Sequence, residues 1–316
     1  MKSKHIPLNS SQASTQIARS LHASHTPFVL AFPSSLLASQ LTIIERDALS
    51  EIDWQELVSL KWSAVPPMVQ NWAEYMRLPS QSGVDIVIAR FNLVVKWAVS
   101  EILLTNDVHD RARTISKFIH VAAHSRRLRN FATMYQLAVA LCSEKVVRLK
   151  RTWMLVSAAE KEVLKALEDF VQPMRNFARL RGEMESALLA PALAGACIPF
   201  IGIYTHDLAF NAQKPAFGST PLNGTVSADE ESMVNFERFQ TKAGIVKNLL
   251  RLLEASARYS VRPNKELVAR CLWLAALEEG ELEQRAKGLE PGTAGSGVGR
   301  VGSAMGRTGS ALGVGR

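Results

Sequence analysis

Cysteine is scarce in this sequence, which has three among its 316 residues. Cys142, Cys197 and Cys271 lie far apart, and no two of them are spaced as Cys-x-x-Cys. Disulfide-stapled domains and cysteine-based zinc fingers need denser or more regular cysteines, so both are excluded and a reducing compartment is expected. The first 27 residues also lack the apolar run of a secretory signal. We therefore expect a cytoplasmic protein with a disordered leader over residues 1–27.

Acidic side chains are missing from both ends of the chain. Residues 1–27 and 291–316 each carry three Lys or Arg and no acid, so six of the eight net positive charges lie there. The last 26 residues also hold nine of the 18 glycines, and burial in so glycine-rich a segment cannot offset its ordering entropy. We expect a disordered Gly/Arg-rich tail over residues 292–316. Its Gly-x-Gly-x-x-Gly pattern lacks the strand and helix that a dinucleotide site requires.

One uncharged run of 20 residues, 186–205, is long enough to cross a membrane. It contains Pro191 and Pro199, and a proline removes a helical hydrogen bond and clashes with the preceding turn. We therefore expect a buried helix end, a turn and a second buried element here, with no stable membrane insertion.

The apolar pattern between the two ends predicts helices. Apolar residues recur every three or four positions over 37–48 and 88–102, as on one face of a helix. Two more helices are expected within 109–142, broken around 125–130, and another is opened by a capping box of Ser157 and Glu160. The last two predicted helices cover 234–259 and 264–286. No run alternates as a substantial sheet would, and residues 213–229 form the one long internal loop.

Positive charge is concentrated in residues 111–151, which hold ten Lys and Arg against the single acid Glu144. Such a face could bind nucleic acid, steer an acidic protein partner or be paired with acids elsewhere, and the pattern leaves these three roles open.

Three histidines, His109, His120 and His124, fall near one helical face if the helix is continuous. A stable zinc site needs a third or fourth ligand, and Asp110 is the only nearby candidate. Surface or half-buried histidines are expected rather than a metal site.

Five stretches stand out in order along the helical segment. They are FNLVVKWAVSEIL, RARTISKFIHVAAHSRRLRNFATMYQLAVAL, VVRLKRTW, CIPFIGIYTHDLAF and VNFERF. Together they resemble the catalytic domain of Ras-type guanine-nucleotide exchange factors, the RasGEF domain. The resemblance covers about residues 28–291. Five ordered motifs over this length are a specific signal, whereas any one alone would be weak.

The resemblance implies an all-α fold, a single large helical bundle with a protruding helical hairpin. It also implies a regulator rather than an enzyme. The protein would bind the nucleotide-free form of a Ras-family small GTPase better than the loaded form, and by linkage would weaken nucleotide binding by the same factor. Its hairpin would open the switch regions and promote GDP release and GTP loading. No cofactor, metal or nucleic acid is implied, and peripheral recruitment to the inner face of the plasma membrane is compatible with it.

By the same resemblance, three groups of residues would carry this function. No residue is expected to do covalent chemistry. The hairpin would present His206 and Asp207, aim Ala209 and Gln213 at the Mg²⁺ and phosphate sites, and rest on Phe200 at its base. The GTPase would be gripped by a bowl containing Tyr135, Cys142, Asn235 and Arg238. The hairpin would be supported by Arg148, Thr152, Trp153 and Phe236, with core packing as the expected role of the aromatic ones.

Several features depart from the family pattern. Gln213 stands where many members have a carboxylate, Cys142 where Asn is usual and Phe239 where a second base is usual. Residues 1–27 are also too short for the N-terminal helical module that usually braces the hairpin. The alternative is therefore a degenerate GTPase-binding scaffold without exchange activity. A nucleic-acid-binding helical protein that uses residues 111–151 is a third interpretation.

Overall fold

The computed structural model describes residues 25–63, 65, 67–79, 81–189, 195–218 and 233–290. The predicted tail over 292–316, most of the predicted leader and part of the predicted loop over 213–229 lie outside these residues. The last residues of the predicted leader have a defined place, because His25 Nε2 lies 3.1 Å from Glu101 Oε2. Residues 25–27 are the only part of the predicted leader that the structure describes, and the disorder of the leader stays a prediction.

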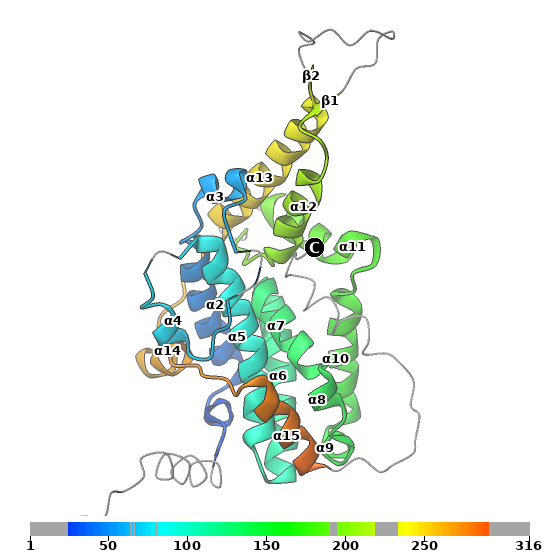
Figure 1. Ribbon diagram of the computed structural model, residues 1–316. Coiled ribbons are helices and arrows are strands. Elements are labelled where there is room, and N and C mark those ends of the chain that lie inside the picture. The colour runs from blue at the N-terminus through cyan, green and yellow to red at the C-terminus, as the bar shows by residue number, and fades with distance from the viewer. Residues whose placement is uncertain are drawn as a thin grey trace, which may run out of the picture.

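The described residues form an all-α bundle, as predicted, with one small antiparallel ribbon (Figure 1). In chain order its elements are η1 (Phe28–Ala31), α2 (Ser34–Leu49), α3 (Trp54–Ser59), α4 (Trp72–Tyr75), α5 (Gly83–Leu104), α6 (Val108–Arg127), α7 (Phe131–Leu141), α8 (Glu144–Val147), α9 (Lys150–Leu155), α10 (Ala158–Phe170), α11 (Met174–Leu189), α12 (Gly202–Ala212), β1 (Phe217–Gly218), β2 (Met233–Val234), α13 (Phe236–Ser256), α14 (Lys265–Leu272) and α15 (Glu279–Leu289).

Helix α5 is the centre of the bundle and is buried on nearly every side by α2, α6, α7 and α15. It begins where the Ser82 hydroxyl accepts a hydrogen bond from the Asp85 amide. Its one fully buried cation, Arg90, donates to Glu45 Oε1 of α2 at 3.2 Å and to the Cys271 carbonyl of α14 at 3.3 Å. A buried charge is tolerated only when it is paired in this way, so Arg90 fixes how three helices meet.

Local sequence signals placed most helices correctly. The predicted helices over 37–48 and 88–102 are α2 and α5, and the predicted break around 125–130 separates α6 from α7. Asn130 makes that break, because its side chain accepts the Thr133 amide and caps α7. Ser157 and Glu160 form the predicted capping box at the start of α10.

The predicted single helix over 264–286 is wrong, because α14 and α15 are separate helices. Between them the chain pairs with other segments: the Ala276 amide donates to the Gln70 carbonyl and the Leu277 amide to Ser100 Oγ. Glu278 then opens α15 with a capping box. These partners lie far away in the sequence, so the helical periodicity alone gave no sign of the interruption.

The uncharged run over 186–205 is divided between two helices, but the first helix end is not buried as expected, because Leu189 is 85% exposed, and residues 190–194 of the expected turn lie outside the described residues. Helix α11 ends at Leu189, and α12 begins at Gly202 after a buried extended stretch in which the Ile198 carbonyl accepts the Phe131 amide. No helix among the described residues is long and apolar enough to cross a membrane.

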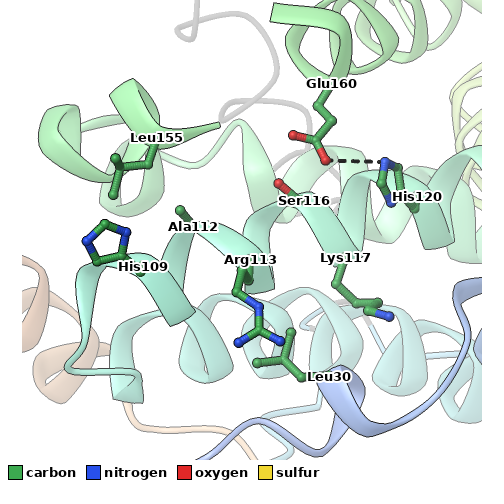
Figure 2. A pocket seen from close by; sticks show the side chains of 9 residues that line it. All are labelled: Leu30, His109, Ala112, Arg113, Ser116, Lys117, His120, Leu155 and Glu160. Carbon is green, nitrogen blue, oxygen red and sulfur yellow. Dashed lines mark ion pairs between the residues drawn. The ribbon is translucent and has the colours of Figure 1, made fainter. Parts of the chain in front are cut away.

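The basic segment 111–151 does not form one uniform surface. Arg111 is buried and donates to the carbonyls of Thr105 and Asn106. The outer face of α6 instead borders a hollow beside η1, α9 and α10, where His120 Nε2 lies 3.3 Å from Glu160 Oε1 (Figure 2). Within the described ranges, no group of three His, Cys, Asp or Glu is arranged to hold a metal ion.

Candidate functional site

Helices α12 and α13 lie side by side and project from one end of the bundle, which confirms the predicted protruding hairpin (Figure 1). The strands β1 and β2 pair at its outer end, with Phe217 opposite Val234. Helix α13 continues past α12 into the bundle, where it contacts α2, α3 and α11. The hairpin is therefore an extension of the core rather than a separate domain.

The outer end of the hairpin is held together by two polar side chains of the return arm. Asn235 caps α13 by accepting the Arg238 amide at 3.1 Å, and its Nδ2 donates to the Pro215 carbonyl at 3.0 Å. Arg238 Nη2 donates to the Ala212 carbonyl at 3.2 Å, and Asn211 Nδ2 of the first arm donates to the Arg238 carbonyl at 2.9 Å. Asn235 and Arg238 were predicted in the bowl, but they lie in this joint between the arms.

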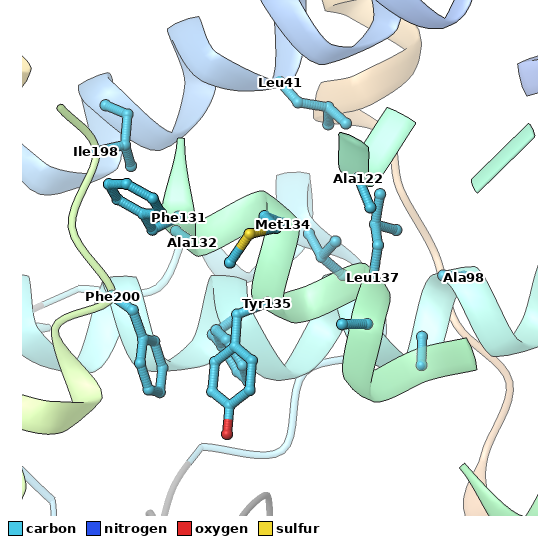
Figure 3. Close-up of a cluster of buried hydrophobic side chains, with 14 of the residues drawn as sticks. Leu41, Ala98, Ala122, Phe131, Ala132, Met134, Tyr135, Leu137, Ile198 and Phe200 are labelled. Atoms are coloured by element: carbon cyan, nitrogen blue, oxygen red, sulfur yellow. The ribbon is translucent and has the colours of Figure 1, made fainter. Parts of the chain in front are cut away.

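The base of the hairpin rests on an aromatic cluster (Figure 3). Phe200 is 5% exposed, and its ring centroid lies 4.5 Å from that of Tyr135 on α7 and 5.2 Å from that of Phe91 on α5. Phe177 of α11 packs edge-on against Tyr135 at 6.3 Å. Each aromatic pair adds about 0.5–1.5 kcal/mol beyond simple burial, so the cluster ties the hairpin base to three helices.

A second contact holds the hairpin from the side. Asp207 Oδ2 of α12 lies 2.7 Å from Arg181 Nη2 of α11, and Asp207 Oδ1 accepts a hydrogen bond from Asn176 Nδ2 at 3.3 Å. The Arg181 guanidinium also lies 5.6 Å from the ring centroid of Tyr204. Arg181 could not be predicted as a site residue, because nothing in the neighbouring sequence distinguishes it from other helical arginines.

The hairpin exposes several apolar side chains to solvent. Phe236, which was predicted to pack in the core, is 73% exposed, and Phe210 on the facing arm is 63% exposed. The exposed set on the hairpin and its ribbon comprises Phe210, Phe217, Met233, Val234, Phe236 and Phe239. His206 and Gln213 are exposed and Ala209 is half-buried. Because exposed apolar patches mark interaction sites, the hairpin is the strongest candidate for a binding element.

The residues predicted to support the hairpin lie elsewhere. Helices α8 and α9 are at the opposite end of the bundle (Figure 1), where Thr152 Oγ1 donates to Glu290 Oε1 at 2.7 Å and Trp153 Nε1 donates to the Val146 carbonyl at 3.0 Å. Arg148 lies between these two helices. The prediction that Arg148, Thr152 and Trp153 support the hairpin is therefore wrong.

Two residues predicted to face a partner are buried. Tyr135 is part of the aromatic cluster at the hairpin base. Cys142 Sγ donates to Glu168 Oε1 at 2.9 Å, and burial together with this carboxylate raises the pKa of the Cys142 thiol far above its ordinary value. Cys142 is thus hydrogen-bonded within the fold, and direct contact of either residue with a GTPase stays a prediction.

Comparison with known proteins identifies the fold. The sequence model of the RasGEF domain matches residues 36–240. The chain belongs to the RasGEF domain family. It is 36% identical over 263 residues to guanine nucleotide exchange factor LTE1 of Candida glabrata, which covers 83% of this chain and 19% of that protein. It is 29% identical over 227 residues to cell division control protein 25 of Saccharomyces cerevisiae, covering 69% and 13% respectively.

LTE1 of Saccharomyces cerevisiae is also similar, with 34% identity over 262 residues that cover 83% of this chain and 17% of the relative. The chain therefore spans less than a fifth of the length of these relatives. The RasGEF match includes the first arm of the hairpin and the start of α13, so the projecting element belongs to the family fold.

Proposed function

We propose that this RasGEF-family protein is a guanine-nucleotide exchange factor for a Ras-family small GTPase. The observation that carries the proposal is the hairpin of α12 and α13, which projects from the bundle with an exposed aromatic surface. The names of the relatives, guanine nucleotide exchange factors among them, support the same activity. The protein acts as a regulator and performs no covalent step, so no cofactor is required.

Exchange works here through differential binding. A small GTPase holds its nucleotide through phosphate contacts and Mg²⁺, and its switch regions close over that site. A hairpin that binds the open, empty form better than the closed form must weaken nucleotide binding by the same factor. The arms can transmit that force because Asn235 and Arg238 join them at the outer end and Phe200 anchors them at the base.

The hairpin divides into surfaces with different roles. The exposed rings of Phe210 and Phe236 supply contact area that the GTPase would bury. Gln213 follows the last turn of α12 and is exposed, so it can occupy space near the phosphates but brings no negative charge. Displacement of the nucleotide would thus be steric rather than electrostatic.

A second candidate function is a GTPase-binding scaffold that does not catalyse exchange. The neutral Gln213 and the buried Cys142 favour it, because neither supplies the group that many family members have at its position. For either function we propose a cytoplasmic protein that meets its GTPase by peripheral recruitment to the inner face of the plasma membrane.

The test is release of a fluorescent GDP analogue from a panel of purified Ras-family GTPases. Accelerated release from one of them at micromolar protein establishes exchange. Binding to an empty GTPase without faster release supports the scaffold instead. Neither binding nor release with any member of the panel would overturn both functions.

A further inference from the structure

Two hollows lie along the outer face of α6, and Figure 2 shows the residues that line the first. The first has a volume of about 450 Å³ and lies between α6, η1, α9 and α10. The second, of about 400 Å³, lies between α6 and α10, and His120 borders both hollows. We call these two adjoining hollows together the α6–α10 groove. The proposed exchange function makes no use of it.

The α6 side of the groove is a stripe of three cations and three histidines, and burial together with the charge of Arg127 lowers the pKa of His124. Residues at steps of three and four lie on one helical face, and the stripe contains His109, Arg113, Lys117, His120, His124 and Arg127. Its ends, His109 and Arg127, are 18 positions apart, which at 1.5 Å per residue is roughly 27 Å along the helix. The stripe is therefore as long as about five turns of a helix laid beside it.

Two of the three cations, Lys117 and Arg127, have hydrogen-bond partners that carry no negative charge. Lys117 Nζ donates to the Phe32 carbonyl, which carries no charge, and Arg127 Nη2 contacts His124 Nδ1. Arg113 does pair with Asp110, although both side chains are largely in solvent. The one acid that lines the groove, Glu160, is already engaged by Ser157 and His120.

The opposite side of the groove is apolar. Leu155 of α9 and Val163 of α10 border it and are 46% and 38% exposed, whereas Leu30 of η1 lies across α6 from Leu155 (Figure 2). Phe, Tyr and Trp are absent from the described residues that line it, so it offers no platform for stacked bases. Lys117 and His124 are half-buried, so only part of each side chain is open to a partner.

The ends of this chain do not complement the groove. Residues 1–27 and 292–316 contain basic residues and no acid, so both would be repelled by the stripe. An occupant must instead bring negative charge on one side and apolar side chains on the other.

We propose that the α6–α10 groove binds an acidic amphipathic helix of a partner protein. Its acids would face Arg113, Lys117 and Arg127, while its apolar side chains would cover Leu155 and Val163. Charge complementarity of this kind mainly sets association rate and specificity, and burial of the apolar wall adds affinity. The groove contains none of the hairpin residues to which the exchange function is assigned.

The experiment uses the full chain and a fluorescein-labelled peptide of about 18 residues, long enough to span the stripe as a helix. Glutamates face one side of the peptide and leucines the other, and a matched peptide has glutamine at every glutamate position. The variant Arg113→Glu/Arg127→Glu reverses two exposed charges of the stripe. The control Arg258→Glu/Lys265→Glu changes the net charge equally at exposed positions outside the groove.

We expect salt-sensitive micromolar binding of the acidic peptide by fluorescence anisotropy. The groove variant should weaken it by about tenfold or more, and the control by less than about twofold. Circular dichroism and unchanged GDP release from the GTPase would show that the variant is folded and that the hairpin is unaffected.

Three results would overturn the proposal. One is absence of binding at about 100 μM peptide and low salt, because the expected dissociation constant is micromolar. Another is equal weakening by both charge-reversed variants, which would mean that only net charge matters. The third is tighter, groove-dependent binding of phosphatidylserine vesicles or single-stranded RNA than of the peptide, which would assign the groove to lipid or nucleic acid.

Discussion

Asp207 of the hairpin and Arg181 of α11 form an ion pair in which Oδ2 and Nη2 lie 2.7 Å apart. About four fifths of each side chain is shielded from solvent, since 21% of Asp207 and 19% of Arg181 are exposed. A pair shielded to this degree is screened by salt less than a surface pair is. Helix α11 therefore braces the first arm of the hairpin with residues of the same domain.

Replacing Arg181 with glutamine should loosen the hairpin without unfolding the bundle. The variant keeps a polar side chain but leaves Asp207 without its charged partner. We expect amide hydrogen exchange over residues 202–212 to become about tenfold faster, and GDP release from the GTPase to slow. Arg179→Gln is the control, because Arg179 is exposed and its side chain donates to the Asp169 carbonyl rather than to a carboxylate. Unchanged protection of α12 would show that the aromatic base alone holds the hairpin.

Phe236 and Phe200 should respond oppositely to truncation. Phe236 is 73% exposed, so Phe236→Ala should leave the melting temperature nearly unchanged while lowering GDP release about tenfold, as expected for an aromatic contact residue. Phe200 is 5% exposed, so Phe200→Ala should cost about 3–5 kcal/mol of stability by leaving a cavity. Calorimetry and the release assay separate the two effects. Loss of stability in Phe236→Ala would mean that its ring packs against the protein after all.

Local patterns predicted the fold better than they predicted the site. The capping box of Ser157 and Glu160 and the break at Asn130 are determined by residues within three positions, so the sequence reveals them. Arg181 and Asp207 are 26 positions apart, and no periodicity connects them. Phe236 was predicted to be buried because aromatic residues are buried on average. Aromatic residues on interaction surfaces are exceptions, and the sequence alone does not identify them.

Distance along the chain also explains why Thr152 was wrongly predicted to support the hairpin. Thr152 belongs to a motif that the family resemblance assigned to hairpin support. Its actual partner is Glu290, 138 positions away, and only the folded chain brings the two together. The motif correctly indicated a structural role, but not which part of the structure it serves.

The three cysteines should be unreactive in the folded protein. Burial raises the pKa of Cys197 to about 12 and that of Cys271 to about 11, and it raises the pKa of Cys142 further with help from Glu168. The thiolate is the nucleophile, so iodoacetamide at about pH 8 should leave all three unmodified until urea is added. Ser260→Cys adds an exposed thiol that should react at once. Mass spectrometry of digested protein identifies the sites, and rapid labelling of Cys142 would contradict its burial.

Glu290 should contribute stability that disappears in acid. Burial alone would raise its pKa, but hydrogen bonds from Thr152 and the Arg151 amide, with the charge of Arg111, outweigh this and lower the pKa. The unfolded state then binds the proton more tightly, so the contribution is complete above about pH 4.5 and is lost as pH falls through the lowered pKa. Urea unfolding at several pH values measures this dependence.

The variant Glu290→Gln should lose about 1–3 kcal/mol at neutral pH, because Arg111 is left buried without its charge partner. It should also lack the part of the acid dependence that Glu290 causes. Glu283→Gln removes an exposed acid 3.9 Å from Lys287 and should cost less than about 0.5 kcal/mol. If both variants lost the same amount of stability, the buried contacts of Glu290 would contribute no more than an exposed ion pair does.

Gln213→Glu distinguishes an exchange factor that works by steric displacement from a scaffold. Gln213 is exposed directly after α12, where a carboxylate would face the phosphates of a bound nucleotide if the hairpin enters the GTPase as proposed. Like charges repel, so GDP release should accelerate by about threefold to tenfold. Gln240→Glu makes the same change at an exposed position on α13 and should have no effect. If both variants bind an empty GTPase and neither accelerates release, charge at the end of α12 is not what limits exchange, and the scaffold becomes the better account of this hairpin.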